Sequence, residues 1–120
     1  MKILIIDDSK PMRHLVRRTL IKAGFTEHEF KEASDGQEAL EAIRESVPDL
    51  VLADWNMPRM SGIELLKALN QEEIKVKFGF ITSEQTAEMS EQANEHGALF
   101  LIGKPFSADI FRETLSEHIQ

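Results

Sequence analysis

Six polar residues share one property: each stands at or just after the end of a short apolar run. They are Asp7, Asp8, Asp54, Thr82, Ser83 and Lys104. Carboxylates held close together repel one another, so either one is protonated or a cation lies among them. Oxygen ligands without His or Cys select a hard cation, for which Mg²⁺ is the abundant choice. A carboxylate can also attack phosphorus to give an acyl phosphate, a transfer that depends mostly on positioning and charge neutralisation.

These residues can act together only if the apolar runs before them are neighbouring strands. Four of the runs are nearly continuous in apolar side chains, which is typical of parallel strands covered on both faces. Parallel strands end at the same edge of a sheet, where open α/β folds bind ligands, so we expect the six residues to converge there. The predicted strands are 3–6, 28–33, 50–53, 78–81 and 98–102, with 28–33 the most polar.

Longer segments with helical spacing separate the predicted strands. Gly24 is expected to end the first helix, and Ser107 to cap the last. Strand and helix alternate five times, which predicts a single doubly wound α/β domain, (βα)5, over residues 1–120 with right-handed crossovers. The apolar stripes consist of Leu15, Val16, Thr19, Leu20 and Ala23; Ala39, Leu40 and Ile43; Ile63, Leu66, Ala68 and Leu69; residues 87–93; and Ile110, Phe111, Leu115 and Ile119.

The composition excludes several classes of function. The net charge is −7, and no basic patch is apparent in the sequence, which argues against a nucleic-acid surface. The absence of cysteine rules out disulfides and thiolate metal sites. There is no signal peptide or membrane-length apolar run, so we expect a cytoplasmic protein with no membrane contact. No glycine-rich nucleotide loop is present, so a phosphoryl group would have to come from another molecule.

Each of the six polar residues also has a simpler structural explanation. An aspartate after a strand is most often a turn residue or a helix N-cap, and a loop lysine is usually solvated. Thr82 and Ser83 could likewise cap a helix that begins at Glu84. These explanations would have to hold at all four strand ends together, so the functional interpretation is favoured.

Four segments of the chain, taken in order, resemble the receiver domain of bacterial response regulators. They are IIDDS, ADWNMPRMSG, FITSE and GKPF, and the resemblance covers essentially the whole chain. DWNMP followed by GIELL is similar to the CheY-like members of the family. The resemblance implies a flavodoxin/CheY-like parallel sheet of five strands in the order 2-1-3-4-5. It also implies a two-component phosphorelay protein that accepts a phosphoryl group from a histidine kinase.

The resemblance gives the polar strand ends specific roles. Asp54 would be the phosphoryl acceptor, Lys104 would pair with a phosphoryl oxygen, and Thr82 would turn its hydroxyl to another. Asp8 would bind Mg²⁺ directly and Asp7 mainly through water. The full set of expected Mg²⁺ ligands is Asp7, Asp8, Asp54 and the backbone carbonyl of Asn56.

The resemblance also predicts how the signal is ended and read. Asn56 and Glu84 match positions that tune dephosphorylation, and we expect relatively rapid self-hydrolysis. Pro105 would follow a cis peptide bond. Leu101 stands where many receivers carry an aromatic residue that reports phosphorylation, which calls that part of the readout into question. The output face of the fourth helix, fifth strand and fifth helix is expected to include Glu88, Met89, Gln92, His96, Leu101 and Lys104.

The expected partners are a sensor histidine kinase or phosphotransfer protein, a downstream target protein and, as a further option, a phosphatase. No enzyme activity is expected beyond the chain's own phosphorylation and dephosphorylation. Chemotaxis is a candidate pathway, and the chain is either a free-standing regulator or a receiver cut from a larger response regulator or hybrid kinase.

Three other classes remain as alternatives. A non-phosphorylated pseudo-receiver would keep the fold as an interaction module. A haloacid-dehalogenase-type phosphatase would place its nucleophile after the first strand, whereas Asp54 follows the third. A flavodoxin-like cofactor binder would need a Ser/Thr/Gly-rich phosphate loop where this chain has DDSKPM.

Overall fold

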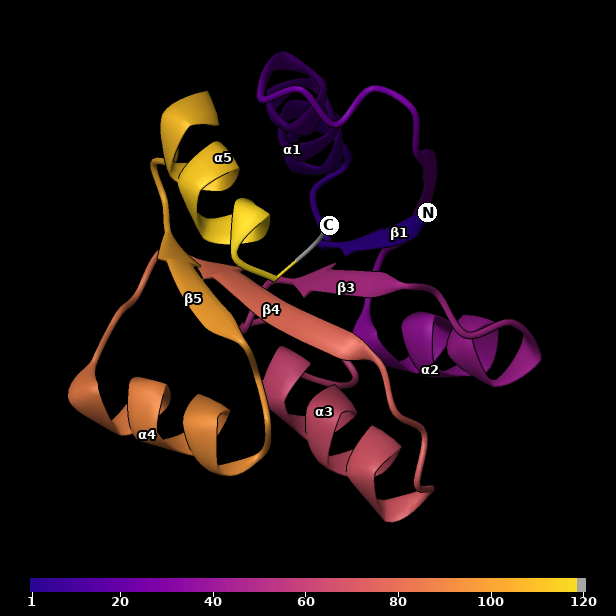
Figure 1. Cartoon of the computed structure of the whole chain (residues 1–120). Coiled ribbons are helices and arrows are strands. Elements are labelled where there is room, and N and C mark those ends of the chain that lie inside the picture. The colour runs from indigo at the N-terminus through magenta and orange to yellow at the C-terminus, as the bar shows by residue number, and fades with distance from the viewer. Residues whose placement is uncertain (119–120) are drawn as a thin grey trace.

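The computed structural model describes residues 1–118 and has a parallel five-stranded sheet between two layers of helices (Figure 1). The strand order is β2-β1-β3-β4-β5, and all neighbouring strands are parallel. The predicted fold class and strand order are therefore confirmed. The elements are β1 (Lys2–Ile6), α1 (Lys10–Lys22), β2 (Glu29–Ala33), α2 (Gly36–Glu45), β3 (Leu50–Ala53), α3 (Gly62–Gln71), β4 (Lys77–Thr82), α4 (Ala87–Glu95), β5 (Phe100–Gly103) and α5 (Ala108–Ser116).

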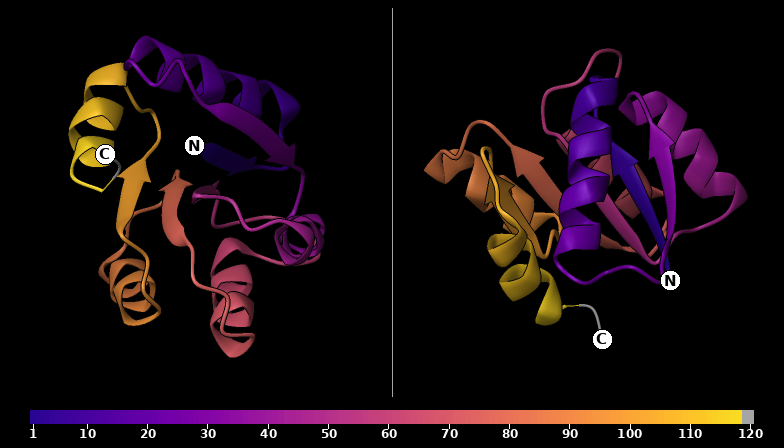
Figure 2. Two further views of the ribbon diagram at one scale, coloured as in Figure 1. Left: turned by 45° about the vertical axis from the view of Figure 1, so that its right-hand side comes forward. Right: turned by 90° about the horizontal axis from the view of Figure 1, so that it is seen from above.

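Helices cover both faces of the sheet, with α1 and α5 on one face and α2, α3 and α4 on the other (Figure 2). Successive residues of a strand point to opposite faces, so each strand supplies both cores. In β1, Leu4 and Ile6 pack with residues of α2 and α3, whereas Ile3 and Ile5 pack with residues of α1 and α5. This two-sided burial explains why β3 is apolar at every position and why β1 is apolar from Ile3 onward.

The polar second strand is an edge strand. β2 pairs only with β1 in the sheet, and its Glu29 and Lys31 are exposed while Ala33 is buried. Phe30 packs in the core on the α1 side and Ala33 in the core on the α2 side, but the other three residues of β2 are charged, so the strand lacks the continuous apolar character of the central strands. The last strand begins two residues later than predicted, because the Ala98 amide donates to the Ala93 carbonyl at 2.9 Å and closes the end of α4.

The helices begin and end at residues whose local chemistry favours a helix terminus. Gly24 has φ +106° just after α1, the left-handed conformation that glycine adopts most readily, and Ser107 caps α5 by accepting from the Ile110 amide. The cap of α4 is Thr86, so the helix-cap explanation for Thr82 and Ser83 is wrong. Ile119, the last member of the predicted α5 stripe, lies outside the described residues.

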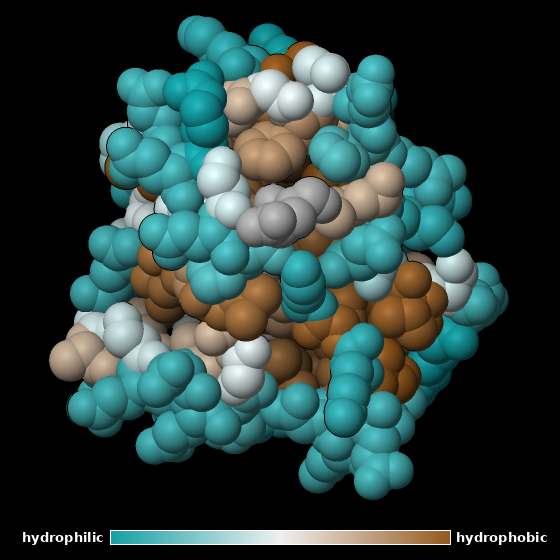
Figure 3. Space-filling model, viewed as in Figure 1, coloured by the Kyte–Doolittle hydropathy of each residue, from teal (hydrophilic) through white to brown (hydrophobic). Residues whose placement is uncertain are grey.

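The molecular surface seen from the direction of Figure 1 is mainly hydrophilic, with apolar side chains visible between the helices (Figure 3). Within residues 1–118, the longest helix is α1 with 13 residues, and none has the length and apolar character needed to cross a bilayer.

Candidate functional site

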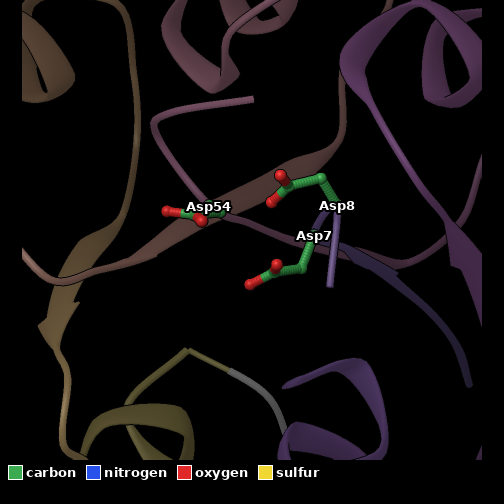
Figure 4. A group of neighbouring side chains, drawn as sticks. All are labelled: Asp7, Asp8 and Asp54. Carbon is green, nitrogen blue, oxygen red and sulfur yellow. The ribbon is translucent and has the colours of Figure 1, made fainter. Parts of the chain in front are cut away.

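The carboxyl ends of β1 and β3 bring three carboxylates together. Ile6 pairs with Ala53 in the sheet, and the Asp54 amide donates to the Ile6 carbonyl at 2.9 Å, so the residues after both strands are neighbours. Figure 4 shows the side chains of Asp7, Asp8 and Asp54 gathered at this edge. One oxygen of each lies within 4.8 Å of the others. A set of oxygen donors at this spacing could hold a hard metal ion.

Asp54 is a partly buried carboxylate with a fixed orientation. Its Oδ1 accepts from the Trp55 amide at 2.7 Å, and its Oδ2 lies 3.3 Å from Nζ of Lys104. Burial raises the pKa of Asp54; Lys104 opposes this effect, and the negative charge of Asp7 adds to it. A cation placed among the carboxylates would remove the cost of ionising Asp54.

Lys104 reaches this cluster from the end of β5. Its Nζ donates to Oδ2 of Asp7 at 3.1 Å as well as to Asp54, and its side chain is 17% exposed. Burial by itself would lower the pKa of Lys104, but its hydrogen bond to the Asp7 carboxylate and the charge of Asp54 raise the pKa overall. Lys104 therefore carries a positive charge inside the site, and it also lines a pocket with Leu101 and Pro105 of the expected output face. The peptide bond to Pro105 is cis, as predicted.

Asp7 and Asp8 have different surroundings. Asp7 is 4% exposed, and its Oδ1 accepts from the Ser9 amide at 2.9 Å while its Oδ2 contacts Lys104. Asp8 is exposed. Both oxygens of Asp7 thus already have partners in the protein, whereas Asp8 offers its carboxylate to solvent or to a cation.

Arg13 supports the backbone of Asp7 and was missed by the sequence analysis. Its Nη1 donates to the Asp7 carbonyl at 2.5 Å, and its Nε donates to Glu32 on β2 at 2.7 Å. The sequence shows an arginine one turn into the first helix, but its role depends on the distance to β2. Only the packing of α1 beside the end of β1 and β2 makes that distance short.

Thr82 lies at the end of β4, beside the end of β5. It is completely buried, and its hydroxyl accepts from the Glu84 amide at 3.4 Å, a long and weak hydrogen bond. Its carbonyl accepts from the Lys104 amide at 2.9 Å, which connects the two strand ends directly. Glu84 itself is exposed, as is Asn56 in the loop after β3.

The remaining residues expected on the output face differ in exposure. Leu101 and Met89 are partly buried and pack against the core on the α4 side, while Phe100 packs on the opposite side of the sheet. The Leu101 carbonyl accepts from Nε2 of Gln85 at 3.5 Å. Within the rest of the expected set, Glu88 and Gln92 are exposed and His96 is partly buried.

Comparison with known proteins places this fold and cluster in one family. The family profile described as the response regulator receiver domain matches residues 3–116. The chain is 40% identical to chemotaxis protein CheY-3 of Vibrio cholerae over 119 residues, 98% of this chain and 90% of that protein. It is 32% identical to sporulation initiation phosphotransferase F of Bacillus subtilis, covering 98% of this chain and 93% of that protein.

Solved structures agree with these relatives. Chemotaxis protein CheY4 of Vibrio cholerae matches with a TM-score of 0.83 and 34% identity, covering 97% of this chain and 96% of that one. A CheY-like receiver domain protein from Methanospirillum hungatei matches with a TM-score of 0.84 and 28% identity, covering 97% of this chain and 90% of that one. These similarities leave no support for the phosphatase or flavodoxin alternatives. The chain belongs to the response regulator receiver domain family and acts as a phosphoryl-accepting signalling component of two-component systems.

Proposed function

We propose that residues 1–120 form a receiver domain that accepts a phosphoryl group on Asp54 with the help of Mg²⁺. The donor is a sensor histidine kinase or a phosphotransfer protein. The observation that carries this proposal is the contact of Lys104 with two carboxylates, Asp7 and Asp54, at a sheet edge where Asp8 also lies. Once a metal ion lies among the carboxylates, a purely structural acid cluster would have no need of this partly buried lysine as well, whereas a pocket for a phosphoryl group would.

The proposed reaction transfers a phosphoryl group from a histidine nitrogen of the donor to a carboxylate oxygen of Asp54. An oxygen of the Asp54 carboxylate attacks the phosphorus of a phosphohistidine, the new P–O bond forms, and the P–N bond breaks to release the imidazole. Mg²⁺, held by Asp7, Asp8, Asp54 and the carbonyl of Asn56, would neutralise negative charge on the phosphoryl oxygens. Lys104 supplies a further positive charge beside Asp54. The protein thus contributes positioning and electrostatic stabilisation, which dominate this class of reaction.

Thr82 and Lys104 are the groups that respond to the added phosphoryl group. The group brings roughly −1.5 to −2 charges and three acceptor oxygens. When the Thr82 hydroxyl turns to donate to a phosphoryl oxygen, it gives up the weak hydrogen bond that it accepts from the Glu84 amide. Charge-assisted hydrogen bonds of about 1.5–3 kcal/mol each could shift the equilibrium between two arrangements of the α4–β5–α5 face toward the active one. Leu101 and Pro105 lie on the β5 side of that face, which a downstream protein target would read.

Asn56 and Glu84 would set the lifetime of the phosphorylated state, because both are exposed beside the acceptor and the switch hydroxyl. The protein would catalyse only its own phosphorylation and dephosphorylation, with a separate phosphatase as a further partner. A role in chemotaxis is supported by the relatives from Vibrio cholerae. We place the protein in the cytoplasm, with no direct contact to nucleic acid or membrane.

The test is incubation with Mg²⁺ and acetyl phosphate, followed by intact mass. The native chain should gain one phosphoryl group, and Asp54→Ala should gain none. Asp109→Ala removes an exposed aspartate on α5 and serves as the matched control, which should be phosphorylated like the native chain. A native chain that stays unmodified would instead support the pseudo-receiver alternative.

A further inference from the structure

The loop between β3 and α3 carries Asn56, whose carbonyl is one of the proposed Mg²⁺ ligands. The loop is anchored at its two ends: the Trp55 ring packs 4.7 Å from the ring of Phe80, and the Trp55 carbonyl accepts from the Gly62 amide at 2.8 Å. Between these anchors Asn56 and Pro58 are exposed. The position of the Asn56 backbone therefore depends on what holds the middle of the loop.

Arg59 connects the middle of this loop to the N-terminus of α2. Its Nε and Nη2 both donate to Oδ2 of Asp35, at 2.9 and 2.6 Å. The backbone of Arg59 has φ +65°, a left-handed conformation that is unfavourable for a residue other than glycine. Such a conformation persists when surrounding contacts hold it, and the ion pair with Asp35 is one of those contacts.

The partner of Arg59 is rigidly held. Asp35 is 4% exposed and is the N-cap of α2, with Oδ1 accepting from the Glu38 amide at 2.8 Å. That amide lowers the pKa of Asp35; burial acts in the opposite direction, and the guanidinium of Arg59 lowers the pKa further. One oxygen of the carboxylate thus fixes the helix, and the other is free to fix the loop.

A second contact shows how closely the loop approaches α2. The Gly36 amide donates to the Met60 carbonyl at 3.2 Å, and a Cβ at residue 36 would lie only 2.5 Å from that oxygen. Glycine is therefore required here by the close approach of the two backbones. The ion pair and this backbone contact lie side by side and together fasten residues 59–60 to the start of α2.

We propose that the Asp35–Arg59 pair positions the β3–α3 loop for metal binding, by holding the Asn56 carbonyl where it can join the carboxylate ligands. Neither residue is a proposed metal ligand, so both are positioning residues. This inference rests on the proposed function, because it needs a Mg²⁺ ion at the acidic cluster. An ordinary exposed ion pair would affect stability slightly and leave metal affinity unchanged.

The first test measures Mg²⁺ affinity directly, without phosphorylation. Trp55 is the only tryptophan of the chain and adjoins Asp54, so its fluorescence can follow a Mg²⁺ titration. Arg59→Ala should raise the Mg²⁺ dissociation constant by about tenfold, the lower end of the range for losing a residue that orients a metal ligand. Arg59→Lys should show a smaller loss. Asp35→Asn, which can still cap α2, should reproduce the effect of Arg59→Ala.

Arg44→Ala is the matched control. Arg44 also pairs bidentately with a carboxylate, that of Glu72 at the C-cap of α3, at 2.9 and 2.6 Å. That pair lies near the C-terminal ends of α2 and α3, remote from the end of α2 that faces the acidic cluster. Arg44→Ala should leave Mg²⁺ affinity unchanged. The inference is overturned if Arg59→Ala binds Mg²⁺ as tightly as the native protein, or if Arg44→Ala weakens binding equally.

A metal-free measurement separates this inference from the proposed function. Hydrogen exchange of the Gly36 amide, observed by NMR without Mg²⁺, should be faster in Arg59→Ala than in the native protein and unchanged in Arg44→Ala. If the native protein binds no Mg²⁺, the proposed function fails whatever the exchange result. If the native protein binds Mg²⁺ but the Gly36 amide exchanges equally in all variants, only the positioning role is overturned.

Discussion

The ammonium of Lys104 lies 3.3 Å from Oδ2 of Asp54, although the two residues are 50 positions apart in the sequence. The contact joins the end of β5 to the end of β3, across the end of β4 where Thr82 lies. Lys104 thus neutralises part of the acidic charge before any phosphoryl group arrives. In the proposed acyl phosphate of Asp54, the phosphoryl oxygens would take over as the partners of Lys104, and the position of Lys104 at the end of β5 would couple the site to the output face.

Replacing Lys104 by methionine should slow phosphorylation by acetyl phosphate. Loss of a charge-assisted hydrogen bond of about 1.5–3 kcal/mol corresponds to a rate reduction of roughly tenfold to a hundredfold. Timed intact-mass measurements in Mg²⁺ would give the rate. Lys75→Met, at an exposed lysine in the α3–β4 connection, should react at the native rate. Equal rates for Lys104→Met and the native protein would contradict the role of the lysine.

The pH dependence of stability should report the burial of Asp54. Because burial raises its pKa in the folded state, ionisation of Asp54 works against folding. The metal-free protein is therefore expected to lose stability as the pH rises from the ordinary range of a carboxyl group through the raised folded pKa. Asp54→Asn lacks this loss and should be more stable than the native protein at neutral pH.

Urea unfolding followed by circular dichroism at a series of pH values would measure this effect. Asp109→Asn, at an exposed aspartate on α5, is expected to follow the native pH profile. The prediction is wrong if the stability of Asp54→Asn falls with rising pH as steeply as the stability of the native protein. Mg²⁺ should narrow the difference in free energy of unfolding between the native protein and Asp54→Asn, because the ion offsets the cost of ionising the partly buried carboxylate.

Thr82→Ala should uncouple phosphorylation from the output face. The hydroxyl makes only a long hydrogen bond in the unmodified protein, so its loss together with that of the buried methyl group should lower stability by about 1–3 kcal/mol, and phosphorylation should proceed. The shift of the Leu101 methyl signals that accompanies phosphorylation in NMR spectra should be reduced. Thr26→Ala, an exposed threonine after α1, should keep the native shift. A full response in Thr82→Ala would remove Thr82 from the switch.

Asn56→Arg should prolong the phosphorylated state. Asn56 is exposed beside the acceptor, and a longer cationic side chain there can block the water that hydrolyses the acyl phosphate and can pair with the phosphoryl oxygens. The decay of the phosphorylated mass after removal of acetyl phosphate should be several-fold slower than in the native protein. Asn94→Arg introduces the same side chain at an exposed position of α4, and its phosphorylated form should decay at the native rate. An unchanged lifetime for Asn56→Arg would refute this role of Asn56.

The sequence by itself determined the fold class, the strand order through the family resemblance, and the residues that stand at the strand ends. These features are local: an apolar run that stops at Asp7 or Asp54 marks both the end of a buried strand and the polar group that follows it. The same local chemistry predicted the cap at Ser107 and the turn at Gly24. The sequence was less informative for β2, because three of the five residues of this edge strand are charged and only Phe30 and Ala33 join the cores.

Only the tertiary structure decided which groups touch. Lys104 bonds with Asp7 across 97 sequence positions, Arg13 supports the Asp7 carbonyl, and Arg59 reaches Asp35. Burial of Asp54, which raises its pKa, likewise comes from elements distant in the chain. Such contacts depend on how helices and strands pack, because a hydrogen bond requires a separation of about 3 Å that no local pattern encodes.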